Sequence, residues 1–260
     1  MWGVKNHRFH PSLSMENLLV ERQELDLSRS ALKALPADLF TRLELQSLNA
    51  YQNEISSIPA EIGRLRALQT LILANNRLTT LPEEFGSLIH LRTLDLGHNH
   101  LVELPRTFGN LIGLFDYLYL HDNRLQTLQE SLFARFTNLR YLNLSDNPFA
   151  HLPESLGVLS NLEELRLENI GLESLPAWMG RLTQLEELSL RNNFLDRLPD
   201  SMESLKELTR LDLRGNRFTS IPNWLAALPK LRKLDLRWNP LSDSSAALRE
   251  LKSRACRVLL

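Results

Sequence analysis

The sequence predicts an α/β repeat solenoid: a right-handed arc with a parallel β-sheet of about ten strands on its concave face and short helical or irregular turns on its convex face. Two observations lead to this prediction. Asparagines recur every 23 or 24 residues, and leucines surround each of them in a fixed frame. A period of this length is typical of stacked units, because no single unit can bury its apolar side chains alone.

The asparagines define the units. Steps of 23 residues join Asn53, Asn76 and Asn99, steps of 24 lead on to Asn123 and Asn147, and steps of 23 return from Asn193 to Asn216 and Asn239. Each asparagine lies in the frame L-x-x-L-x-L-x-x-N-x-L-x-x-L-P, as in the run LRTLDLGHNHLVELP at 91–105. Two further units keep the frame but have Ser30 or Ile170 in place of the asparagine. Ten units therefore cover residues 22–241.

This frame resembles the leucine-rich-repeat family. The return segments of the form L-P-x-x-I/F-G, in a chain with one cysteine, are similar to intracellular repeat proteins of the Ras-suppressor and scaffold type. The resemblance implies an adaptor or regulatory recognition module and no catalytic residue. The departures at Ser30 and Ile170 and the two longer steps concern only local geometry.

Elementary physical chemistry explains the frame. Leucines alternate with polar residues at 93–97, which is the pattern of a half-buried strand. The asparagine follows the strand, where its side-chain amide can bond backbone groups that the turn leaves unpaired. Ile170 lacks this amide, so either water or Asn169 must serve those backbone groups or the turn must reshape to avoid needing them. Ile170→Asn is predicted to be neutral or mildly stabilising. Proline then opens the return segment at the first position of a short helix.

Both ends of the stack require caps. Residues 1–21 form the predicted N-terminal cap, in which Met15, Leu18 and Leu19 follow Ser14 with helical spacing. Residues 242–260 form the predicted C-terminal capping helix, beginning at Asp243 or Ser244, with an outer Glu250–Arg254 pair. Its buried face would comprise Leu248, Leu251, Ala255 and Val258 or Leu259. A docking helix for a partner is the alternative interpretation of either cap.

The outward positions of the strands are the candidate recognition surface, because the leucines are committed to the core. All four tyrosines, Tyr51, Tyr117, Tyr119 and Tyr141, fall on these positions, and Ile72, His121 and Arg166 share the same face. Strand spacing predicts a contiguous patch of the last three tyrosines. Tyrosine is favoured at interfaces because it combines a large apolar area with a polar tip. The alternative is cross-strand aromatic pairing that only stiffens the sheet.

The C-terminal units carry a different pattern. Arg191, Arg214 and Arg237 occupy one outward column of three successive strands, hereafter the arginine column; Arg210 and Lys233 lie across the strands, and Trp238 lies at the edge. These guanidinium groups could grip the acidic residues of a partner whose apolar residues cover the tyrosines. Neighbouring acids, among them Glu168, Glu187, Asp212 and Asp235, could instead neutralise them. The sequence does not decide between partner binding and internal neutralisation for these arginines.

Several functional classes receive no support from the sequence. The 30 basic and 31 acidic residues lack the basic excess of a general nucleic-acid binder, and no apolar stretch has the length of a membrane span. His98 and His121, with Asp95 and Asp122 nearby, suggest the beginnings of a metal site, but their positions follow from the repeat. No catalytic triad or phosphate loop is present, so we expect no enzymatic activity, metal or cofactor. Cys256 is expected to be a structural thiol, and the sequon at Asn143 is expected to be unused.

The predicted function is recognition of another protein on the concave face by a monomeric adaptor, in intracellular signalling. The single cysteine favours a reducing cytoplasm. Two alternatives remain: a secreted bacterial effector that binds host proteins, and a sensor subunit for a separately encoded kinase or GTPase.

Overall fold

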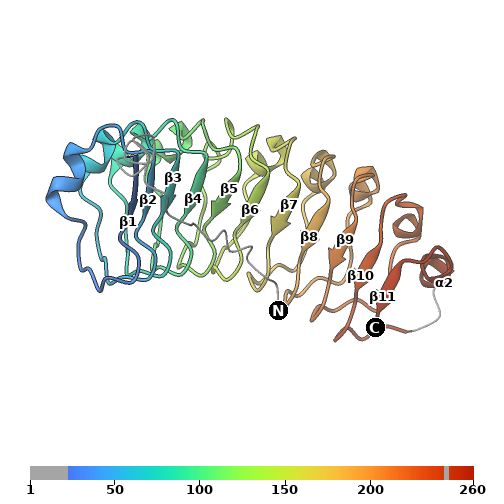
Figure 1. The fold of residues 1–260 in the computed structure, drawn as a ribbon. Coiled ribbons are helices and arrows are strands. Elements are labelled where there is room, and N and C mark those ends of the chain that lie inside the picture. Colours follow the sequence, from blue (N-terminus) through green and yellow to red (C-terminus); the bar gives the residue numbers. More distant parts are fainter. Residues whose placement is uncertain (1–22, 243–245) are drawn as a thin grey trace, which may run out of the picture.

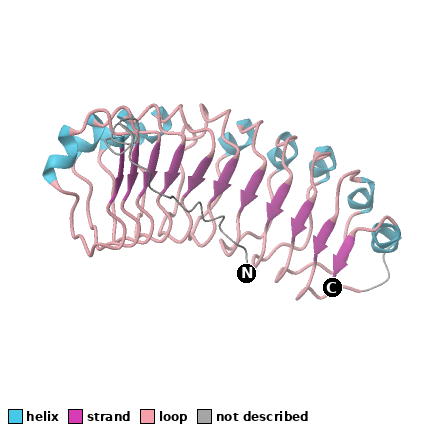
Figure 2. Ribbon diagram, viewed as in Figure 1, coloured by secondary structure: helices cyan, strands magenta, loops and turns pink. Residues whose placement is uncertain are grey.

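The computed structural model describes residues 23–242 and 246–260. They form one open arc in which the strands stand side by side and short helices line the opposite side (Figures 1 and 2). The predicted N-terminal cap at 1–21 lies outside the described residues. Within the described ranges, no helix combines the length and apolarity needed to cross a membrane.

The sheet contains eleven parallel strands in sequence order. The strands are β1 (Glu24–Asp26), β2 (Ser47–Asn49), β3 (Thr70–Ile72), β4 (Thr93–Asp95), β5 (Tyr117–Tyr119), β6 (Tyr141–Asn143), β7 (Glu164–Arg166), β8 (Glu187–Ser189), β9 (Arg210–Asp212), β10 (Lys233–Asp235) and β11 (Arg257–Leu259). Each central leucine is in register with the next, as Leu94 is with Leu118 and Leu118 with Leu142. From β2 to β10 the central leucines are buried in one continuous hydrophobic core, which confirms the predicted alternation, and Leu25 of β1 is partly buried against it.

The return segments are short 3₁₀ helices in eight units. They are η1 (Ala37–Thr41), η2 (Ala60–Arg64), η3 (Glu83–Ser87), η4 (Arg106–Asn110), η5 (Glu154–Val158), η6 (Ala177–Arg181), η7 (Asp200–Ser204) and η8 (Asn223–Ala227). A proline directly precedes each of these eight helices, as Pro82 precedes η3 with φ −71°. The prediction of proline at the first helical position is thus wrong by one residue. The fifth unit has Gln129 in place of proline, and its return segment is a series of turns.

The asparagines form a ladder along the edge of the sheet. Asn99 is typical: its Nδ2 donates to the carbonyls of Leu73 and Leu96, and its Oδ1 accepts from the amide of Leu78, all within 3.1 Å. One side chain thereby bonds backbone groups of two units. Such bonds satisfy buried polar groups that the turn would otherwise leave unpaired, as the sequence predicted.

The two units without asparagine have a reshaped turn, which for the seventh unit is one of the three alternatives that the sequence left open. The residue before the asparagine position has a positive φ in each unit, and the first and seventh units add a second such residue, Ala31 at 52° and Gly171 at 78°. In both cases the asparagine of the following unit accepts two hydrogen bonds from the reshaped turn. Asn53 Oδ1 accepts from the amides of Ser30 and Leu32, and Asn193 Oδ1 does the same for the seventh unit.

The C-terminal cap differs from the single predicted helix. Helix α2 (Ala246–Ser253) buries Ala247, Leu248 and Leu251, but the chain then turns at Ala255 (φ 61°) and forms β11. Ala255 is exposed and does not pack in the core. Arg254 does not pair with Glu250; its guanidinium donates to the carbonyls of Ala226, Leu228 and Pro229. The cap therefore closes the stack with a helix and with an added strand that pairs with β10.

Candidate interaction surface on the concave face

The strand register brings the central tyrosines together. Tyr117 on β5 lies opposite Tyr141 on β6, and Tyr119 lies opposite Asn143. The ring centroids of Tyr117 and Tyr119 are 5.8 Å apart with nearly parallel planes, and Tyr141 lies 5.5 Å from Tyr117 and 4.8 Å from Tyr119. The rings touch because they stand on two adjacent strands of the parallel sheet, whose backbones are about 4.8 Å apart. We call Tyr117, Tyr119 and Tyr141 the tyrosine cluster.

The three rings differ in exposure. Tyr117 is 45% exposed, whereas Tyr141 is only 8% exposed. Burial raises the pKa of Tyr119 to about 12 and raises the pKa of Tyr141 further, because the charged phenolate is disfavoured away from water. Tyr141 therefore supports the patch from below, while Tyr117 presents a ring face that a partner can reach.

Two histidines extend the tyrosine cluster. The His121 ring is 6.0 Å from Tyr119 and 4.7 Å from His98. His98 Nδ1 lies 2.5 Å from Asp122 Oδ2, and the two Nε2 atoms are 3.2 Å apart. The two Nε2 atoms lie within hydrogen-bond distance, so one ring donates to the other. Burial and the proximity of His98 lower the pKa of His121 to about 4.

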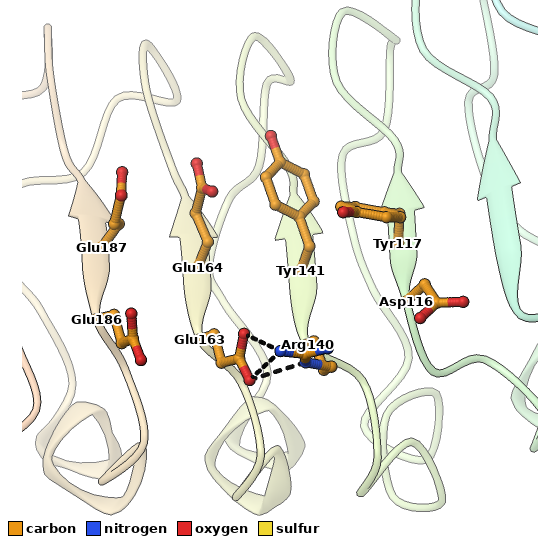
Figure 3. Close-up of a pocket in the computed structure, with 8 residues that line it drawn as sticks. All are labelled: Asp116, Tyr117, Arg140, Tyr141, Glu163, Glu164, Glu186 and Glu187. Atoms are coloured by element: carbon orange, nitrogen blue, oxygen red, sulfur yellow. Dashed lines mark hydrogen bonds and ion pairs between the residues drawn. The ribbon is translucent and has the colours of Figure 1, made fainter. Parts of the chain in front are cut away.

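A hollow of about 240 Å³ opens beside the tyrosine cluster (Figure 3). Strands β5 to β8 supply its walls in two rows. One row runs from Tyr117 through Tyr141 and Glu164 to Glu187, and the other from Asp116 through Arg140 and Glu163 to Glu186 (Figure 3). Arg140 Nη2 is bound to Glu163 at 2.7 Å. We call these eight residues the tyrosine–glutamate hollow.

Arg166 is a cation that this surface binds through both an aromatic ring and a carboxylate. Its guanidinium lies 5.6 Å from the centroid of the Tyr141 ring and bonds the Glu164 carboxylate at 2.7 Å. Burial alone would lower the pKa of Arg166, but its contacts with Tyr141 and Glu164 outweigh this and raise it. The site thus combines an aromatic face with a carboxylate around one positive charge.

The arginine column is paired with carboxylates in the structure. Arg191 contacts Glu168 at 3.0 Å, Arg214 contacts Asp212 and, at 3.5 Å, Asp235, and Arg237 contacts Asp235 at 2.7 Å. Hydrogen bonding to Asp212 raises the pKa of Arg214. Burial of Asp235 disfavours its charge, yet the bonds from Arg237 hold the pKa of Asp235 below its usual range. Of the two readings of the column, this geometry favours internal neutralisation.

Of the other predicted residues, Arg210 reaches a glutamate of the hollow, and the rest are not among the residues that line it. Arg210 on β9 contacts Glu187 at 2.8 Å, and Lys233 follows it on β10. Tyr51 and Ile72 lie toward the N-terminal end, with Arg29 5.9 Å from the Tyr51 ring. Trp238 is 69% exposed at the edge of the sheet, in a left-handed backbone conformation with φ 62°. The structure therefore divides the predicted surface into separate regions along the arc.

The sequence reasoning missed the lower row of the hollow. These residues directly precede the strands, whereas the surface was predicted from the outward positions of the strands themselves. Phe115, next to Asp116, is another omission: its ring lies 5.4 Å from the Arg92 guanidinium and 6.0 Å from that of Arg140. A signal was present, since Glu163-Glu164 and Glu186-Glu187 occupy the same position of two successive units.

Other predicted features have defined environments. In the described ranges, no group of three or more His, Cys, Asp or Glu side chains is arranged to hold a metal ion. Burial raises the pKa of the Cys256 thiol, which packs in the C-terminal cap. Asn143 of the sequon is 7% exposed and its Oδ1 accepts from the Ser145 amide. Trp178 lies on η6 and Trp224 on η8, on the side opposite the sheet.

Comparison with known protein families gives three matches. A model described as leucine-rich repeat region matches residues 118–253, one described as leucine rich repeats (2 copies) matches 66–108, and one described as leucine rich repeat matches 23–78. The first of these covers more than half of the chain. A comparison with curated proteins finds no match.

Solved structures share the fold. A leucine-rich-repeat protein of Leptospira interrogans is 32% identical with a TM-score of 0.86, over 91% of this chain and 60% of that one. The plant peptide hormone receptor RGFR1 in complex with RGF2 is 31% identical with a TM-score of 0.71, over 80% and 34%. TLR13 in complex with ssRNA13 is 28% identical with a TM-score of 0.71, over 82% and 32%. The chain thus spans less than two thirds of each of these proteins.

Proposed function

This chain belongs to the leucine-rich-repeat family, and we propose from that premise that it is a recognition module which binds a protein partner on its concave face. Leucine-rich-repeat proteins are typically non-enzymatic binding modules, and the fold and its neighbours support a protein–protein interaction module. The plant receptor among those neighbours is in complex with RGF2, which supports the idea that such an arc holds another molecule.

The observation that carries the proposal is the tyrosine cluster. Its most exposed member, Tyr117, stands on the open sheet with its ring stacked on Tyr119 and supported by Tyr141. A preformed aromatic surface loses little side-chain entropy on binding, so it is well suited to be an interface hot spot. The arginine column is a weaker candidate because its charges are already paired.

We further propose that the module is a monomeric adaptor that acts in cytoplasmic signalling. The single cysteine, Cys256, is buried in the cap and takes no part in a disulfide, which suits a reducing compartment. Fractionation of the producing cells, with an assay for the protein in the medium, distinguishes this location from that of a secreted effector. Identification of a kinase or GTPase as the bound partner would support a sensor role instead.

Site-specific photo-crosslinking tests the binding face. A benzoylphenylalanine at position 117 should capture the partner in the producing cells, whereas the same group at exposed Ile112, outside the strands, should not. Tyr117→Ala should weaken partner binding at least tenfold, and Ile112→Ala should leave it unchanged. Crosslinks from position 112 alone, with full binding by Tyr117→Ala, would show that the partner uses another face. Tyr141 is less suitable for this test because its burial links it to stability.

A further inference from the structure

We propose that His98 and His121, hereafter the histidine pair, bind a divalent transition-metal ion such as zinc through their Nε2 atoms. This inference goes beyond the proposed function and does not depend on it. It also revises the sequence-based expectation of no metal, which attributed the positions of the two histidines to the repeat. The site has two protein ligands, so it is smaller than the groups of three or more that the described residues lack.

The first argument is the distance between the two nitrogens. His98 Nε2 and His121 Nε2 are 3.2 Å apart. A tetrahedral zinc ion holds each imidazole nitrogen at about 2.05 Å, which places two such nitrogens about 3.3 Å from each other. An ion can therefore bind with almost no movement of either side chain. A hydrogen bond between the rings has the same length, so the surroundings of the histidine pair must distinguish the two.

The second argument is the carboxylate beside His98. His98 Nδ1 lies 2.5 Å from Asp122 Oδ2. A histidine that binds a metal through Nε2 carries its proton on Nδ1, and in protein metal sites this N–H almost always donates to a carboxylate, a carbonyl or water. Asp122 is such an acceptor, and its bond holds the ring with Nε2 toward His121.

The third argument is the way His121 is held. Its Nδ1 is buried and has no hydrogen-bond partner among the described residues, so Nε2 is the nitrogen that it presents to other groups. The ring lies against Gly97, where a Cβ atom would overlap with Cε1 of His121. Tyr119 also contacts the ring, with centroids 6.0 Å apart. A side chain that is already fixed loses little entropy when it binds an ion.

The fourth argument is charge. Besides Asp122, the carboxylates of Asp95 and Asp146 act on the histidine pair. Within the described ranges, none of these three forms an ion pair with a lysine or arginine: Asp95 accepts from a backbone amide, Asp146 from an asparagine amide and Asp122 from His98. Arg166 opposes them at His121, but its own charge is bonded to Glu164. The local field therefore favours a cation.

The chemistry of the ligands indicates the class of ion. Imidazole nitrogen suits zinc, copper and nickel, whereas magnesium and calcium prefer oxygen ligands. The His98 side chain is 52% exposed and that of Asp122 is 58% exposed, so water reaches the site. The histidine pair supplies two of the four positions around zinc, and water fills the other two in the free chain.

Zinc titration of untagged, chelator-treated protein near neutral pH tests the inference, with an indicator dye that competes for the ion. One zinc ion per chain should bind to the histidine pair. Zinc should also raise the melting temperature, because a ligand that binds only the folded chain stabilises it. Magnesium at the same concentration should neither displace zinc nor change the melting temperature.

Matched variants locate the ion. His98→Gln and His121→Gln should each weaken zinc binding at least tenfold, because each removes one of two ligands. Asp122→Asn keeps both ligands but weakens the acceptor for His98, and it should cost about tenfold. His90→Gln and His151→Gln remove exposed histidines of other units and should have no effect. The double variant of the histidine pair measures zinc binding by the other histidines of the chain.

Gly97→Ala is a test that removes no ligand. The added Cβ displaces the ring of His121, so zinc binding should weaken, while the melting temperature of the zinc-free variant shows how far the change acts through stability.

Three results would overturn the inference. The first is equal zinc affinity of the wild type and the double variant, and the second is an equal loss from His90→Gln and His98→Gln. The third is full affinity of His121→Gln with a loss in His100→Gln, since His100 lines a hollow with His98 and the ion would then lie there. The proposed function is tested separately, because crosslinking from position 117 requires no ion.

Discussion

Asn193 bonds the amide of Ile170, the residue that stands where most other units have asparagine. Its Oδ1 accepts hydrogen bonds from the Ile170 amide at 3.2 Å and from the Leu172 amide at 3.0 Å, while its Nδ2 donates to the carbonyls of Leu167 and Leu190. Asn216, in the next unit, accepts only from the Leu195 amide of the unit before. The seventh turn therefore makes one hydrogen bond more to the asparagine of the next unit than the eighth turn makes.

This relationship predicts unequal costs for two matched substitutions. Asn193→Ala should lower the free energy of unfolding by roughly 1 kcal/mol more than Asn216→Ala, because it leaves one more buried amide without an acceptor. Chemical denaturation of both variants measures the difference. Equal costs would mean that water replaces the lost acceptor at the seventh turn.

The structure changes the expectation for Ile170→Asn. Ile170 is 4% exposed and packs in the hydrophobic core, so asparagine there loses apolar burial. The gain is limited to an acceptor for the Phe149 amide, which has no hydrogen-bond partner in the described structure. We now expect a net loss of about 1 kcal/mol in place of a neutral effect. A higher denaturation midpoint for this variant would show that the turn returns to the form of the other units.

The C-terminal cap should be essential for solubility. Deletion from Ser242 onward removes Leu248 and Leu251 from the end of the core and exposes the backbone edge of β10, which β11 otherwise pairs. Open edges and uncovered apolar units favour aggregation. Light scattering of the truncated protein should show large particles at concentrations where the full chain is monomeric. A monomeric truncated protein with unchanged melting would contradict this role of the cap.

The backbone conformation of Trp238 should make the protein less stable than a variant with asparagine at this position. A bulky residue with φ 62° is disfavoured, whereas the equivalent position of the preceding unit has Gly215 at φ 63°. Trp238→Asn should raise the free energy of unfolding by roughly 0.5 kcal/mol, after loss of the Arg237–Trp238 contact. Thermal melting of the two proteins measures the change. A lower melting temperature for the variant would show that the contact with Arg237 outweighs the strain.

His121 should make stability depend on pH. Since its pKa falls from 6.5 to about 4 on folding, the unfolded chain binds the proton more tightly between these values. The resulting stabilisation is complete above pH 6.5 and is lost as the pH falls toward 4, with a limit of about 3 kcal/mol. Denaturation of the wild type and of His121→Gln at pH 7 and pH 4.5 measures this. The variant should lose less stability on acidification; an identical loss would assign the effect to other groups.

The repeat explains why so much of the fold was predictable. Leu94 and Leu118 occupy the same position of successive units, so any parallel stack that buries one must bury the other in register. The same logic places Tyr117 beside Tyr141 and brings the arginines into one column. The period also identified the seventh unit as irregular, although the shared role of Asn193 was not visible in the sequence.

The end of the chain was less predictable because the period stops there. Leu248 and Leu251 have helical spacing, and α2 buries both. The residues after Ser253 continue an apolar pattern, but the open edge of β10 offers backbone hydrogen bonds that a longer helix would leave unpaired. The cap therefore ends in a strand, since Leu259 can accept from the amide of Leu236 there.

The sequence by itself determined which side chains face outward and which strands are neighbours, because both follow from the alternation of leucines and from the period. Only the tertiary structure decided what those side chains contact. It paired Arg214 with Asp212 and Arg237 with Asp235, and it left Tyr117 exposed above buried Tyr141. These contacts depend on side-chain rotamers and on the local curvature of the sheet, which bring particular charged and aromatic groups within contact distance. The repeat cannot predict them, because it fixes the outward positions but the residues at those positions differ from unit to unit.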